Sequence, residues 1–182
     1  YAQELLAFLV DAALTRLRAW RDYLGLPRER DRLWFADDSL ALLSGEAYRE
    51  FILPHHRRFL TTDAVPGAPV NFHLCGDATR HFATLVEELH AVGFDTGYPV
   101  DHGRLRRELG PEIEIQGGPT CDLLRYGTPA EVAAETRRIL RSGVMDGGKF
   151  VLKEANNLAP RTPIANLQAM YDVCRTEGRY AA

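Results

Sequence analysis

The segment 71–75, Asn-Phe-His-Leu-Cys, places an imidazole and a thiol two residues apart, at His73 and Cys75. Side chains alternate between the two faces of a β-strand, so this pair would share one face while Phe72 and Leu74 occupy the other. An imidazole nitrogen and a thiolate sulfur are ligands that zinc prefers. The spacing also fits a buried histidine beside an inert core cysteine, and on spacing alone that alternative is the more common one. The motif therefore predicts a candidate metal pair and leaves the alternative open.

A pair of carboxylates, Asp37 and Asp38, directly follows the apolar segment 33–36. Parallel α/β proteins bind ligands at the carboxyl ends of their strands. One carboxylate of the pair could therefore point into a pocket and position a substrate or a proton. The alternative is a cap on a turn or a helix. Further polar residues follow the other predicted strands: Asp101, His102, Glu154, Asn156 and Asn157.

These residues need a scaffold, and the hydrophobic pattern predicts one of alternating strands and helices. Helices are predicted over 1–24, 45–61, 78–92, 101–109, 128–142 and 163–177, and strands over 33–36, 70–74, 94–98, 112–116 and 149–153. Such alternation predicts a parallel sheet with helices packed outside it. A complete (β/α)8 barrel takes about 250 residues, so five units would need strands from outside this sequence or from a second chain. An open doubly wound sheet is the alternative.

Local signals refine this pattern. Ser44, Asp101 and Thr128 are expected to cap the helices that follow them. The arginines at 104, 106 and 107 are interpreted as a solvated helix face, and His55 and His56 as surface residues. Cys121 is expected in a loop after the fourth strand.

Charge and composition exclude some function classes. The formal net charge of -3 argues against nucleic acid as the main partner, because phosphate binding needs a clustered basic surface. No apolar stretch approaches the roughly 20 residues that span a bilayer, and the first residues lack the order of a signal peptide. Three scattered cysteines form no disulfide framework, so we expect reduced thiols and a cytoplasmic protein.

Five segments together resemble one family: 37–44, 72–76, 127–132, 147–152 and 160–166. Their order and content resemble the uroporphyrinogen decarboxylase-like superfamily, and the His-x-Cys-Gly of 73–76 resembles its cobamide-linked methyltransferases. The resemblance spans nearly all 182 residues. It implies that residues 1–182 form the C-terminal part, about five βα units, of a (β/α)8 barrel without its N-terminal strands.

The resemblance also implies a zinc-dependent methyltransferase that exchanges a methyl group between a corrinoid on a partner protein and a thiol or another small molecule. In that branch, the histidine and cysteine of His-x-Cys bind zinc together with a second cysteine, seven residues before the proline of a closing Thr-Pro. This sequence has Asn156 there, where decarboxylases have histidine. Glu154 lies two residues earlier on the same strand face, so His73, Cys75 and Glu154 could supply three ligands and leave a fourth position open. A salt bridge at the rim is the alternative role of Glu154.

Two other functions stay open. A porphyrinogen-type carboxy-lyase would need cationic side chains to hold substrate carboxylates, and Arg161 is the obvious candidate. A metal-free, degenerate barrel that binds a ligand or a partner chain is the third possibility. Under the methyltransferase hypothesis, Asp37 and Asp38 shape the pocket, and Asn156 and Arg161 contact substrate.

Overall fold

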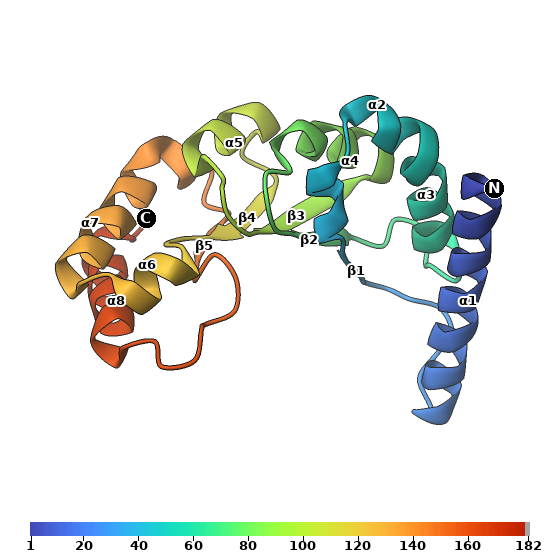
Figure 1. The fold of residues 1–182 in the computed structure, drawn as a ribbon, viewed down its shortest axis with the longest axis horizontal. Coiled ribbons are helices and arrows are strands. Elements are labelled where there is room, and N and C mark those ends of the chain that lie inside the picture. The colour runs from blue at the N-terminus through green and yellow to red at the C-terminus, as the bar shows by residue number, and fades with distance from the viewer. Residues whose placement is uncertain (181–182) are drawn as a thin grey trace.

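The computed structural model describes residues 1–180 and contains one sheet of five parallel strands in sequential order. The strands are β1 (Leu33–Ala36), β2 (Val70–Leu74), β3 (Ala91–Thr96), β4 (Glu114–Gly117) and β5 (Phe150–Leu152). Helices follow one side of the curved sheet, and the other side is concave (Figure 1). The predicted alternation of parallel strands and helices is confirmed, and the arrangement is that of five successive βα units of a (β/α)8 barrel.

Apart from α6 (Cys121–Tyr126), which was not predicted, the helices lie close to their predicted positions. They are α1 (Ala2–Tyr23), α2 (Gly45–Ala47), α3 (Leu53–Thr61), α4 (Phe82–Leu89), α5 (His102–Leu109), α6 (Cys121–Tyr126), α7 (Pro129–Ile139) and α8 (Ile164–Glu177). Ser44, Asp101 and Thr128 each accept a hydrogen bond from a backbone N–H in the first helical turn, as expected. Within residues 1–180, no helix is both long and apolar enough to cross a bilayer.

The core lies between the sheet and its helices. Phe72, Leu74, Phe94 and Ile115 are fully buried there. Residues that alternate with them point to the concave side and are polar: His73 on β2 aligns with Asp95 on β3, and Asp95 aligns with Gln116 on β4. The strand register therefore gathers polar side chains on the concave side.

The structure differs from the predicted elements most clearly around α4 and β3 and after β4. The helix predicted over 78–92 ends at Leu89, because His90 adopts a left-handed conformation with φ of 55° and its N–H bonds back to the last turn. Strand β3 consequently begins at Ala91 instead of residue 94. The loop expected after the fourth strand contains the six-residue helix α6, whose first residue is Cys121.

Two predicted surface residues are buried. Arg106 is 3% exposed, and its guanidinium donates to the carbonyls of Gly110, Ile113, Val144 and Lys149. The prediction of a solvated arginine face is wrong at this position, because Arg106 satisfies backbone acceptors that apolar side chains could not.

His56 is the second such residue and is 7% exposed. It lies on the buried stripe of α3, three residues after Leu53 and four before Leu60. The prediction of a surface histidine is therefore wrong for His56, because the face of α3 that carries His56 packs against the core.

Candidate metal centre

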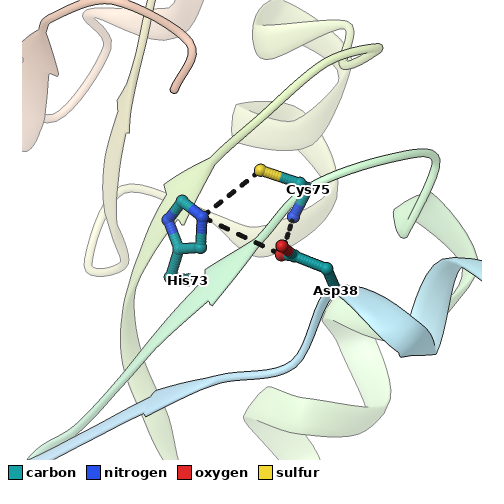
Figure 2. Close-up of side chains that lie close together, drawn as sticks. All are labelled: Asp38, His73 and Cys75. Atoms are coloured by element: carbon teal, nitrogen blue, oxygen red, sulfur yellow. Dashed lines mark hydrogen bonds and ion pairs between the residues drawn. The ribbon is translucent and has the colours of Figure 1, made fainter. Parts of the chain in front are cut away.

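Asp38, His73 and Cys75 form a group whose ligand atoms all lie within 4.8 Å of one another. His73 Nε2 lies 3.3 Å from Cys75 Sγ and 3.8 Å from Asp38 Oδ1 (Figure 2). His73 and Cys75 come from the end of β2, and Asp38 begins the short helical turn Asp38–Leu42 after β1. Because β1 and β2 are parallel neighbours, their ends meet at the same edge of the sheet.

Backbone contacts fix this group in place. The backbone N–H of Cys75 donates to Asp38 Oδ1 at 2.7 Å. The backbone N–H of Gly97 donates to the Leu74 carbonyl, and a Cβ at Gly97 would lie 2.7 Å from both Cα and Sγ of Cys75. The close approach of the segment after β3 to Cys75 therefore requires glycine at this position.

Asp95 sets the orientation of the His73 ring. His73 Nδ1 lies 2.9 Å from Asp95 Oδ2, and the Lys153 ammonium donates to both oxygens of the same buried carboxylate at 2.9 and 3.0 Å. A proton held on Nδ1 by Asp95 leaves the Nε2 lone pair directed at Cys75 and Asp38. The sequence prediction missed Asp95 and Lys153. A charged residue inside the otherwise apolar strand β3 was the signal that could have identified Asp95.

The donor set fits a zinc ion. Bond lengths of about 2.0–2.1 Å to nitrogen and about 2.3 Å to sulfur place a nitrogen and a sulfur ligand of a tetrahedral ion about 3.5–3.6 Å apart. The observed separation of His73 Nε2 from Cys75 Sγ is 3.3 Å, so a small outward movement of the two side chains would admit the ion. Burial, with the nearby Asp38 carboxylate, raises the pKa of the Cys75 thiol to about 11. The protein environment therefore keeps this thiol protonated at neutral pH, and a bound dication would supply the positive charge that stabilises the thiolate.

Asp37 has a different role from its neighbour. Its carboxylate lies 3.1 Å from His56 Nε2 and accepts hydrogen bonds from the backbone and the hydroxyl of Ser39. Burial opposes ionisation, but the bonds from His56 and Ser39 outweigh it and lower the pKa of Asp37. Asp37 thus caps the turn that begins with Asp38, which is the alternative that the sequence left open.

The remaining predicted site residues are not members of this group. Glu154 is not among the members of the metal group in the described part of the chain. Asn156 lines a cavity of about 280 Å³ that Cys75 and Cys121 also line. Arg161 is exposed with φ of 65° and is not among the residues that line this cavity. The roles of Glu154 and Arg161 stay predictions.

The fold and the site define a class of protein: βα units of a (β/α)8 barrel with ligand-capable side chains at the carboxyl ends of the strands. The chain belongs to the uroporphyrinogen decarboxylase (URO-D) family, whose family model matches residues 28–177. This membership confirms the resemblance seen in the sequence.

Two curated relatives carry different activities. A methylated-thiol–coenzyme M methyltransferase of Methanosarcina mazei is 31% identical over 79% of this chain and 37% of its own length. A uroporphyrinogen decarboxylase of Saccharopolyspora erythraea is 32% identical over 95% of this chain and 48% of its own. The chain thus spans less than half the length of these two relatives.

A solved methyltransferase from Methanosarcina mazei has a similar fold. It superposes with a TM-score of 0.68 at 18% identity, over 94% of this chain and 48% of that one. At this identity, the likeness concerns the fold alone.

Proposed function

We propose that the chain carries the metal-binding part of the active site of a methyltransferase, which moves a methyl group between a protein-bound corrinoid and a thiol or another small molecule. The observation that carries this proposal is the group of Asp38, His73 and Cys75 with the ring of His73 held by Asp95. The methyltransferase relative supports the reaction class.

Each residue has a definite task. His73 Nε2, Cys75 Sγ and a carboxylate oxygen of Asp38 would hold zinc, which lowers the pKa of a coordinated thiol so that a thiolate persists at neutral pH. Asp95 keeps the Nδ1 proton on His73. Asp37 acts indirectly, because its cap fixes the turn that carries Asp38. Asn156 would contact substrate in the cavity beside Cys75.

Elemental analysis of purified, zinc-reconstituted protein tests the ligand set. We expect about one zinc per chain in the wild type, loss of zinc in Cys75→Ser, and retention in Glu154→Ala. Asp38→Asn should bind zinc more weakly, although its side-chain oxygen can still accept the Cys75 N–H. Loss of zinc in Glu154→Ala with retention in Asp38→Asn would make Glu154 the third ligand. A wild type without zinc after reconstitution would contradict the proposal.

A carboxy-lyase of the decarboxylase type is the second candidate, and the decarboxylase relative favours it through its coverage of 95% of this chain. Such an enzyme must hold substrate carboxylates with cationic groups. The cavity beside Cys75 lacks them among residues 1–180. Decarboxylation of a porphyrinogen by metal-free protein would support this candidate. If the protein neither binds zinc nor decarboxylates a porphyrinogen, the metal-free barrel that binds a ligand or a partner chain remains as the third hypothesis.

A further inference from the structure

A cavity of about 470 Å³ lies at the amino end of the strands, opposite to the end that carries the metal group. Its wall contains Leu33 and Val70, the first residues of β1 and β2, and the C-terminal ends of α3 and α4. The loop 64–68, between α3 and β2, forms the remaining side. Two consecutive βα units of the described chain therefore build this wall.

The cavity has the size and the composition of a small-molecule site. Such sites commonly measure about 300–1,000 Å³ and combine an apolar wall with a few polar groups. Aliphatic side chains form much of this wall, among them Leu33, Leu60, Val65, Val70 and Leu89. They would remove the apolar body of a ligand from water, which favours binding.

The polar groups beside this wall carry an excess of positive charge. Glu88 accepts a hydrogen bond from the Arg57 guanidinium at 2.6 Å, and Arg49 lies 3.5 Å from the other oxygen of the same carboxylate. One carboxylate thus faces two guanidinium groups. Arg57 lines the cavity, and because a guanidinium has five N–H donors, it can bind a second carboxylate beside Glu88.

Two further polar residues of the wall differ in what they offer a ligand. The hydroxyl of Thr61 already donates to the backbone carbonyl of Arg57 at 2.8 Å. His90 is exposed, and its imidazole adds a nitrogen donor to the wall. An anionic group would therefore meet donors from Arg57 and His90, whereas a cationic group would meet the excess positive charge.

We propose that this cavity binds a small carboxylate, whose apolar body contacts the aliphatic wall and whose anionic group pairs with Arg57. Among the described residues, none that lines this cavity belongs to the metal group or to the cavity beside Cys75. The proposal goes beyond the methyltransferase function and does not rest on it. A ligand at the amino ends of the strands leaves the carboxyl ends free for substrate.

Three probes that share one apolar body test the charge preference. They are 4-phenylbutyrate, 4-phenyl-1-butanol and 4-phenylbutylamine, with a negative, a neutral and a positive end group. Dissociation constants are measured by saturation-transfer NMR on protein without added zinc, so that the carboxylate has no metal to coordinate. The carboxylate should bind about threefold more tightly than the alcohol, and the amine should bind most weakly. An amine that binds as tightly as the carboxylate, or no binding of any probe, would overturn the proposal.

A pair of neighbouring arginines tests which cation holds the carboxylate. Arg57→Gln should abolish the preference for 4-phenylbutyrate over the alcohol, because it removes the charge at the cavity wall. Arg58→Gln is the matched control: the side chain of Arg58 pairs with Asp11 and does not line the cavity, so the preference should persist. A preference that survives Arg57→Gln would contradict the proposal.

Variants that fill the cavity test its position. Val65→Trp and Thr61→Trp each place an indole at the wall and should weaken the binding of all three probes by about tenfold or more. Both positions are exposed, so the substitutions leave the buried core unchanged. Leu42→Trp adds the same ring at an exposed position in the turn after β1, at the opposite end of the sheet, and should bind the probes like the wild type. Wild-type affinity in both Val65→Trp and Thr61→Trp would overturn the proposal. Zinc content is measured separately, so failure of this site and failure of the metal centre are distinguishable.

Discussion

At the scale of single residues, the candidate site depends on how His73 is held. Its ring bridges two charged groups, with Asp95 on Nδ1 and the Cys75 and Asp38 ligand atoms near Nε2. The Lys153 ammonium lies 2.9 Å from Asp95 Oδ1, so the buried Asp95 side chain has an ion-pair partner as well as its contact with His73. Polar contacts therefore run in series through the site, from Lys153 to Asp95, from Asp95 to His73 and from His73 to Cys75.

Asp95→Asn is expected to weaken zinc binding about 10- to 100-fold, because the amide accepts the Nδ1 proton more weakly than the carboxylate does. Zinc affinity is measured by competition with a chromophoric chelator. Glu114→Gln, on the neighbouring strand β4, removes the same charge without touching His73 and should leave the affinity unchanged. Equal affinities of Asp95→Asn and the wild type would show that Asp95 does not orient the ligand.

Zinc affinity should rise with pH by about tenfold per unit between pH 7 and 9. The reason is that zinc displaces the proton of the Cys75 thiol, whose pKa is raised to about 11, so metal and proton compete over this whole range. Isothermal titration in buffers of different ionisation enthalpy should report about one proton released per zinc from this thiol. Cys75→Ser should lose this dependence, and an affinity that does not change with pH would contradict the assignment of Cys75 as a ligand.

At the scale of elements, strand order decides which residues can meet. β1 is the direct neighbour of β2, so Asp38 reaches Cys75 without crossing another strand. β5 is three strands away from β2, which is roughly 14 Å along the sheet. Glu154 could reach His73 and Cys75 only across the concave side.

Asp37 and His56 connect the turn after β1 to α3. Asp37→Asn should lower the free energy of unfolding at pH 7 by about 1.5–3 kcal/mol, since it removes a largely buried charged acceptor. The folded pKa of Asp37 is lowered, so its contribution is fully present above the unfolded value of about 3.9 and is lost as the pH falls through the folded value. Urea unfolding at pH 7 and pH 3 should therefore show a smaller difference from wild type at pH 3. A difference that grows in acid would contradict this role.

The elements could be predicted from the sequence much better than the contacts within the site. Strands β1 and β2 have the predicted bounds because the apolar run of β1 ends at Asp37 and the alternating pattern of β2 ends before Gly76. Helix α6 was missed because six residues hold too little periodicity. Pairing of His73 with Asp95 depends on the register of β2 and β3, which no single-strand pattern contains. The choice of Asp38 over Glu154 as neighbour of Cys75 likewise depends on strand order.

At the scale of the whole molecule, five parallel strands form a curved sheet that does not close on itself (Figure 1). Trp34 on β1 and Val151 on β5 are 57% and 44% exposed. We propose that strands from outside the described residues pair with β1 and β5 and cover the concave side, as the sequence led us to expect.

Buried Arg106 joins the half of the molecule that contains β4 and β5. Its guanidinium donates to backbone carbonyls after α5, before β4 and before β5. Arg106→Met would leave these buried acceptors unpaired, so it should lower the free energy of unfolding by about 3–5 kcal/mol. The adjacent Arg107 is exposed, and Arg107→Met should change stability by less than about 0.5 kcal/mol. Thermal or urea unfolding compares the two variants, and similar losses in both would contradict the role of Arg106.

The central claim is that Cys75 and His73 bind zinc together with an oxygen ligand. X-ray absorption at the zinc edge of reconstituted protein tests it most directly. The account predicts one sulfur at about 2.3 Å and the remaining nitrogen or oxygen ligands at about 2.0–2.2 Å, with the sulfur lost in Cys75→Ser. A spectrum with nitrogen and oxygen ligands alone, or one that Cys75→Ser leaves unchanged, would contradict the proposed metal centre.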